Sequence, residues 1–129
     1  MSHQFHHAHI KSKDPRASAA WWADMFGAEV LPETEFGSML FCPVRIGETV
    51  INITRPDPDE GTRDAPTIPY YGLEHLGLIT NDLDGDLARF EAQGLEIYER
   101  RPGAGGFEIA FVATPDGACL ELLQPAKEG

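Results

Sequence analysis

Four residues with metal-binding side chains occupy matching places in the two halves of the chain. The interval from His7 to His75 is nearly the same as the interval from Asn52 to Glu121. Two imidazoles, a carboxylate and an amide oxygen suit a divalent cation and leave coordination positions open for a substrate. A Glu side chain deep in a cleft also requires a compensating charge, which a cation supplies. This spacing therefore indicates a metal-dependent enzyme site.

Almost the same interval recurs at residues that begin and end helices, which indicates an internal repeat. It separates Asp14 from Asp82, and it separates Gly27 from Gly94. A chain of 129 residues can form one well-packed domain but not two independent ones, so the halves are predicted to share one core. The predicted organisation is a single domain over residues 1–129, made of module one (1–55), a linker (56–72) and module two (73–129).

Each module is predicted to contain a strand, a helix and three further strands. In module one, Asp14 caps a helix that begins with Pro15 and ends at Gly27. In module two, Asp82 caps a helix that ends at Gly94. Strands are expected at residues 5–12, 28–31, 38–41 continuing past Pro43, 48–54, 74–80, 95–100, 107–113 and 118–123. Two βαβββ modules predict an α+β fold with a curved mixed sheet and the helices on its outer face.

Alternation along four strands predicts a polar face opposite the face that packs against the helices. Ile51 and Ile53 should pack while Asn52 points to the other side, and the residues around Glu121 show the same pattern. The polar face is predicted to carry His7, His9, Lys11, Asn52, His75 and Glu121. On a curved sheet these side chains would converge in a cleft.

Three of these residues are candidates for roles beside the metal. His9 can act as a general acid or base, or it can be a hydrogen-bonded pocket residue. Glu121 can combine metal ligation with proton abstraction, or it can ligate only. Lys11 can pair with a substrate carboxylate, or it can extend into solvent.

Composition excludes several classes of partner. The formal net charge is −11 and the ten Lys and Arg residues are scattered, so no basic stripe is present for nucleic acid or an anionic membrane. No apolar run approaches the roughly 20 residues that span a membrane, and the N-terminus lacks the features of a secretory signal. Cys42 and Cys119 have no CxxC spacing and are expected to be reduced packing residues, with a disulfide as the open alternative. A cytoplasmic protein with a small-molecule substrate is expected.

Three stretches of the chain resemble the vicinal oxygen chelate superfamily, and the pattern is closest to glyoxalase I-like proteins. The superfamily includes glyoxalase I, methylmalonyl-CoA epimerase, fosfomycin-resistance enzymes, extradiol dioxygenases and bleomycin-resistance proteins. The matching stretches are residues 7–15 with the helix end at 24–27, residues 75–82, and residues 109–121. The resemblance implies that a divalent metal ion (Zn, Ni, Co, Mn or Fe) is held by His7, Asn52, His75 and Glu121. It also implies a homodimer.

A metal-dependent lyase or isomerase of the glyoxalase type is the preferred interpretation of this resemblance. Its substrate would bind the metal through two vicinal oxygens, and Glu121 or His9 would move a proton on the adjacent carbon. Bacterial glyoxalase I has Glu where this chain has Asn52. Without Asn52, the remaining ligands form the two-His-one-carboxylate set of an Fe(II) extradiol dioxygenase. A metal-free binding protein of the bleomycin-resistance type is the other alternative, because an acidic chain suits a basic ligand.

Overall fold

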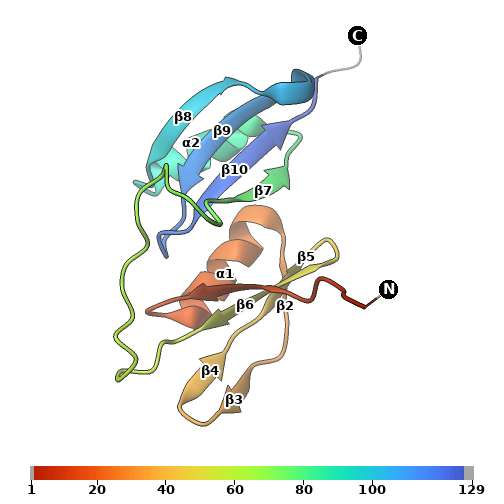
Figure 1. The fold of residues 1–129 in the computed structure, drawn as a ribbon. Coiled ribbons are helices and arrows are strands. Elements are labelled where there is room, and N and C mark those ends of the chain that lie inside the picture. Colours follow the sequence, from red (N-terminus) through yellow and green to blue (C-terminus); the bar gives the residue numbers. More distant parts are fainter. Residues whose placement is uncertain (1, 127–129) are drawn as a thin grey trace. The chain divides into compact units, whose positions relative to one another are not determined.

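The computed structural model describes residues 2–126 and divides the chain into two compact units. The first unit extends to Arg63 and the second begins at Asp64, so the boundary falls inside the segment predicted as a linker. Each unit carries its own mixed sheet and one α-helix (Figure 1). The α+β class predicted from the sequence is confirmed, with the strands distributed over two sheets.

Within residues 2–63, the first unit contains one helix and a six-stranded sheet. The elements are β1 (Ala8–Lys11), α1 (Pro15–Phe26), β2 (Glu29–Val30), β3 (Thr34–Phe36), β4 (Met39–Phe41), β5 (Val44–Ile46) and β6 (Thr49–Thr54). The order is β2-β5-β6-β4-β3, and β1 pairs with β6 in parallel. Since β1 and β6 come from opposite ends of the unit, this pairing brings its first and last strands together.

Two strands of the first unit differ from the prediction. The strand expected at residues 38–41 and beyond Pro43 is divided into β4 and β5, because proline lacks the N–H that continues a ladder. A further strand, β3, pairs antiparallel with β4 through a turn at Gly37, which has a φ of 61°. All three residues of β3 are exposed. Alternation of buried and exposed residues, the usual sequence signal of a strand, is therefore missing here.

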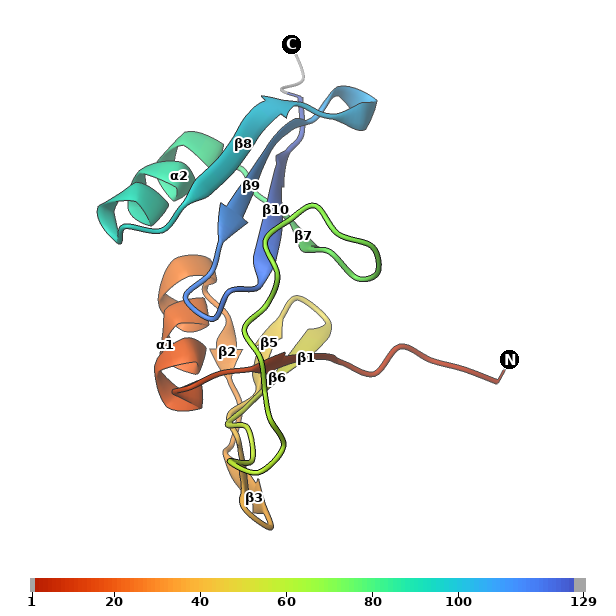
Figure 2. The same ribbon diagram turned by 60° about the vertical axis from the view of Figure 1, so that its left-hand side comes forward.

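Helix α1 lies along one face of the first sheet (Figure 2). The Asp14 side chain accepts a hydrogen bond from the Ala17 amide (3.1 Å), and Gly27 ends the helix with a φ of 67°, as predicted. Trp22 of this helix is buried, and so are Ile51 and Ile53 of β6. The predicted alternation is therefore confirmed, because Asn52 between these two isoleucines is only half-buried.

Over residues 64–126, the second unit has one α-helix and a four-stranded sheet, as the sequence predicts. The elements are β7 (Leu76–Ile79), α2 (Leu83–Ala92), β8 (Ile97–Pro102), a short 3-10 helix (Ala104–Gly106), β9 (Glu108–Ala113) and β10 (Cys119–Gln124). The order is β7-β10-β9-β8, and β7 pairs with β10 in parallel. The two units thus repeat one arrangement, with the first strand parallel to the last.

Both faces of the second sheet bury apolar side chains. Helix α2 lies along one face (Figure 2), where Phe90, Leu120 and Leu122 are fully buried. The other face carries a second cluster, formed by Ile109, Phe111 and Cys119 with the partly buried Ile68, Tyr98, Phe107 and Leu123. Glu121 belongs to this second face, because it alternates with Leu120 and Leu122 along β10.

Two further expectations concern cysteines and membranes. Cys42 and Cys119 are both buried, and both are free thiols. Among residues 2–126, none of the helices has the length and apolar character that crossing a bilayer requires.

Candidate functional site

The second unit brings His75 and Glu121 into contact. His75 Nε2 lies 3.3 Å from Glu121 Oε1, and the two side chains are 30% and 18% exposed. Glu121 lies opposite Gly77 in the parallel pairing of β7 with β10. Because His75 is two residues before Gly77, it reaches the same side of the sheet even though β7 itself begins only at Leu76. An imidazole nitrogen and a carboxylate oxygen thus lie side by side in a half-buried place.

Two neighbours hold the His75 ring. Glu74 Oε1 lies 2.9 Å from His75 Nδ1, on the nitrogen that does not face Glu121. The edge of the ring meets Phe111 at a centroid distance of 5.0 Å, and Phe111 lies opposite Glu121 in the pairing of β9 with β10. The sequence alone does not predict a role for Glu74. The feature of the sequence that could have indicated this role is the position of Glu74 directly before His75, a candidate metal ligand.

The electrostatic field around His75 is negative. Burial raises the pKa of the Cys119 thiol, and the charge of Glu74, with a smaller contribution from Glu121, acts in the same direction. Glu74 and Glu121 lie at the two nitrogens of the partly buried His75 ring, and two such carboxylates attract a cation. The chemistry of these donors therefore fits a divalent metal ion.

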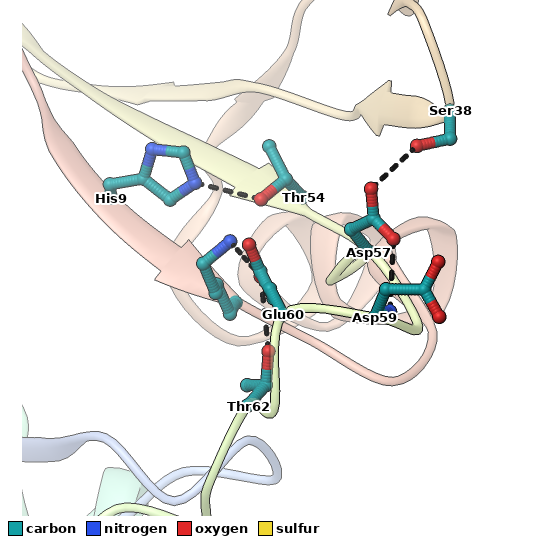
Figure 3. A network of polar contacts seen from close by, with 8 residues as sticks. His9, Ser38, Thr54, Asp57, Asp59, Glu60 and Thr62 are labelled. Atoms are coloured by element: carbon teal, nitrogen blue, oxygen red, sulfur yellow. Dashed lines mark hydrogen bonds and ion pairs between the residues drawn. The ribbon is translucent and has the colours of Figure 1, made fainter.

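His9 and Asn52 lie together in the first unit. His9 is opposite Asn52 in the parallel pairing of β1 with β6. His9 Nε2 lies 2.7 Å from the hydroxyl of Thr54, a fully buried residue at the end of β6 (Figure 3). The pKa of His9 is lowered, first by burial and then by electrostatic interaction with Lys11 and His7, while Glu60 opposes the shift. The neutral imidazole, which can accept a proton, is therefore favoured.

His7 lies immediately before β1 and is exposed. Its Nδ1 is 2.7 Å from His6 Nδ1, and its ring centroid is 6.0 Å from that of His9. The structure thus places His7 and Asn52 in the first unit, and His75 and Glu121 in the second. Within residues 2–126, neither unit by itself gathers three or more His, Cys, Asp or Glu side chains into a metal-binding group.

Lys11 is paired with a residue that sequence reasoning did not identify. Lys11 Nζ lies 2.6 Å from Glu60 Oε1, which also accepts a hydrogen bond from Thr62 Oγ1 (3.0 Å). These contacts tie residues 55–63 to β1 (Figure 3). Glu60 lies in an aperiodic segment, 49 residues from Lys11 in sequence, so no local pattern pointed to it.

A second carboxylate, that of Asp57, also holds residues 55–63 through hydrogen bonds. Asp57 accepts hydrogen bonds from Ser38 Oγ (3.2 Å) and from the Asp59 amide (3.0 Å) (Figure 3). Residues 55–63 therefore contact β1 through Lys11 and the chain just before β4 through Ser38, and the Arg55 amide also donates to the Leu40 carbonyl of β4 (3.4 Å).

Comparison with known proteins gives one family and several relatives. The family model described as "Glyoxalase/Bleomycin resistance protein/Dioxygenase superfamily" matches residues 4–122. Glyoxalase I of Saccharomyces cerevisiae is 22% identical over 147 residues, covering 95% of this chain and 45% of the yeast protein. The chain therefore spans about half the length of this curated relative.

Solved structures share the fold at low sequence identity. The glyoxalase family protein from Enterococcus faecalis has a TM-score of 0.72 and 24% identity, covering 95% of this chain and 98% of that one. A mutant of the fosfomycin resistance protein FosX from Listeria monocytogenes, complexed with Mn(II) and 1S,2S-dihydroxypropylphosphonic acid, has a TM-score of 0.74 and 20% identity. That alignment covers 98% of this chain and 95% of that one.

Proposed function

The chain belongs to the Glyoxalase/Bleomycin resistance protein/Dioxygenase superfamily, and from this membership we propose that it is a divalent-metal-dependent lyase or isomerase of the glyoxalase type. Its substrate is a small compound that offers two vicinal oxygens to the metal. The yeast relative is a glyoxalase I, and the Listeria relative was solved with Mn(II) and a dihydroxy compound, both in agreement with this proposal.

The contact between His75 and Glu121 is the observation that carries the proposal. An imidazole nitrogen and a carboxylate oxygen lie 3.3 Å apart on one sheet face. Both are ligands that Zn, Ni, Co, Mn and Fe accept, and both side chains keep part of their surface open. The carboxylate of Glu74 adds negative charge from the other side of the ring. A cation neutralises this group of carboxylates better than the protein alone does.

The first unit is proposed to supply the remaining ligands, His7 and Asn52. We propose that His7 and Asn52 serve the same metal ion as His75 and Glu121, and that the protein is a homodimer. Asn52 contributes a neutral amide oxygen, which binds a divalent cation more weakly than a carboxylate does. We therefore propose His7, His75 and Glu121 as the principal ligands. We also propose that the protein functions in the cytoplasm.

Two residues of the protein, Glu121 and His9, are candidates for the proton acceptor in this reaction. A bound divalent metal supplies Lewis-acid polarisation of a substrate oxygen, which makes the neighbouring C–H bond more acidic. Glu121 accepts the proton at its carboxylate, or His9 accepts it at its imidazole, which its lowered pKa keeps neutral. Phe111 and the apolar cluster around it exclude water from one side of His75.

Metal analysis joined to a substrate screen tests this function. The purified protein is analysed for metal content, reconstituted separately with Zn, Ni, Co, Mn and Fe(II), and assayed with aldehyde–thiol adducts, acyl thioesters and catechols. We expect about one metal per chain and turnover of an aldehyde adduct or acyl thioester with Ni, Co or Zn, without oxygen uptake. Glu121→Gln should abolish this turnover.

Two other results would each replace the proposed function. Catechol cleavage that requires Fe(II) and consumes oxygen would identify a dioxygenase. A protein that holds no stoichiometric divalent metal, even after supplementation, would identify a metal-free binding protein.

A further inference from the structure

The residue before His75 determines which ring nitrogen is available to a ligand. Glu74 Oε1 lies 2.9 Å from His75 Nδ1, and an ionised carboxylate can only accept a hydrogen bond. Nδ1 therefore donates in this contact, which is the shorter of the two that His75 makes with carboxylates. In the neutral ring the lone pair is then on Nε2, the nitrogen that lies 3.3 Å from Glu121 Oε1.

Glu74 is itself held in place. The hydroxyl of Tyr70 donates a hydrogen bond to the backbone carbonyl of Glu74 (3.1 Å), which links the segment before β7 back on itself. The Glu74 side chain is 27% exposed, so its contact with His75 is partly shielded from water. Phe111 meets the same ring edge-on, so the ring is restrained on two sides.

Module one makes a contact of the same kind at the matching position. His6 precedes His7 as Glu74 precedes His75, so the two neighbours occupy equivalent places in the repeat. His6 Nδ1 lies 2.7 Å from His7 Nδ1, so one of these rings donates to the other through Nδ1. The repeat thus places a side-chain partner on the Nδ1 of both proposed histidine ligands.

We propose that Glu74 is a positioning residue that holds His75 as the Nδ1–H tautomer and directs its Nε2 to the metal. The part of this inference that concerns the metal rests on the proposed function. Outer-shell carboxylates of this kind orient a histidine ligand and make it more basic, and their removal typically weakens metal affinity by roughly 10- to 100-fold. His6, which is uncharged when it accepts through Nδ1, makes the weaker version of this contact in module one.

The test reads the tautomer of His75 in the metal-free protein and then the metal affinity. The tautomer comes from the ¹⁵N shifts of the ring at a pH where it is neutral, and the affinity comes from titration with Zn or Co. The variants are Glu74→Ala, Glu74→Gln and, as a matched control, Glu91→Ala, which removes an exposed carboxylate from α2 of the same unit.

We expect His75 to be the Nδ1–H tautomer in the unaltered protein and to lose this preference in Glu74→Ala. Metal affinity should fall roughly 10- to 100-fold in Glu74→Ala and less in Glu74→Gln, whose amide oxygen still accepts from Nδ1. Glu91→Ala should change neither quantity. An Nε2–H tautomer in the unaltered protein, or a Glu74→Ala variant with unchanged tautomer and affinity, would overturn the inference.

The two readouts separate this inference from the proposed function. If the unaltered protein binds no divalent metal, the proposed function fails. A tautomer of His75 that depends on Glu74 would even then support the positioning role.

Discussion

Gly77 lies opposite Glu121 in the parallel pairing of β7 with β10. A β-carbon at Gly77 would lie 4.0 Å from Glu121 Oε1 and 3.4 Å from Leu123 Cδ1, so the absence of a side chain leaves space beside the carboxylate. The first unit fills the equivalent place with a large side chain, because His9 lies opposite Asn52 in the pairing of β1 with β6. The two units therefore share a backbone arrangement but present different chemistry at matching positions.

Enlarging the side chain at Gly77 should disturb Glu121 in proportion to size. Gly77→Ala makes only an ordinary van der Waals contact with Leu123, so we expect the free energy of unfolding to change by less than about 1 kcal/mol. Gly77→Val should displace the Glu121 carboxylate and weaken metal binding. Metal titration and thermal unfolding of the two variants check this. Equal metal affinity in both would show that the space beside Glu121 has no role in the site.

The pKa of His9 should respond in opposite directions to two substitutions. Burial and the charge of Lys11 lower this pKa from its ordinary value of 6.5, while Glu60 raises it. In the metal-free protein, Lys11→Met should therefore raise the pKa of His9, and Glu60→Gln should lower it further. NMR titration of the His9 ring measures both shifts, and shifts of the same sign would contradict this account of its surroundings.

The same pKa shift fixes the sign of a stability effect. Because the pKa of His9 is lower in the folded state, the unfolded chain binds a proton first as the pH falls below about 6.5. The contribution of His9 to stability is present above that pH and is lost as the pH falls through the folded value. His9→Gln should reduce this part of the pH dependence, as measured by denaturant unfolding at several pH values.

The ion pair between Lys11 and Glu60 should protect residues 55–63 from proteolysis but contribute little to the free energy of unfolding. The two side chains are 38% and 40% exposed, so solvent screens the pair and its loss should change the free energy of unfolding little. Glu60→Ala should nevertheless release residues 55–63 from β1 and speed trypsin cleavage after Arg63. Asp59→Asn removes a charge from the same segment without altering the Lys11 contact, and it should leave the cleavage rate unchanged. Equally fast cleavage of both variants would contradict the tether.

Local patterns in the sequence were sufficient for the helices and the principal strands. Asp14 and Gly27 act on atoms within a few residues of themselves, so the limits of α1 could be predicted from their chemistry alone. The alternation around Asn52 and Glu121 was also predictable, because the faces of a strand follow a period of two. The repeat predicts only that both units share one arrangement; the parallel pairing of first and last strands in each unit comes from the structure.

Contacts between distant or irregular segments could not be predicted in the same way. Strand β3 is exposed at every residue, so its only signal was the turn at Gly37. The contact of Lys11 with Glu60 depends on how an aperiodic segment turns back to β1, which no periodicity describes. The proposed role of Glu74 depends on the rotamer of a half-buried side chain, which the order of residues in the sequence does not determine.

The proposal that His7, His75 and Glu121 bind one divalent cation is best tested by metal titration. Calorimetry with Zn or Ni is applied to the unaltered protein and to five variants: His7→Ala, Asn52→Ala, His75→Ala, Glu121→Ala and the control His3→Ala. We expect one metal site per chain and a loss of metal affinity of more than about 100-fold in His7→Ala, His75→Ala and Glu121→Ala, which is larger than the effect of removing an outer-shell partner. Metal affinity should fall less in Asn52→Ala, and it should not change in His3→Ala. Unchanged metal affinity in His7→Ala, His75→Ala or Glu121→Ala would contradict the proposed ligand set.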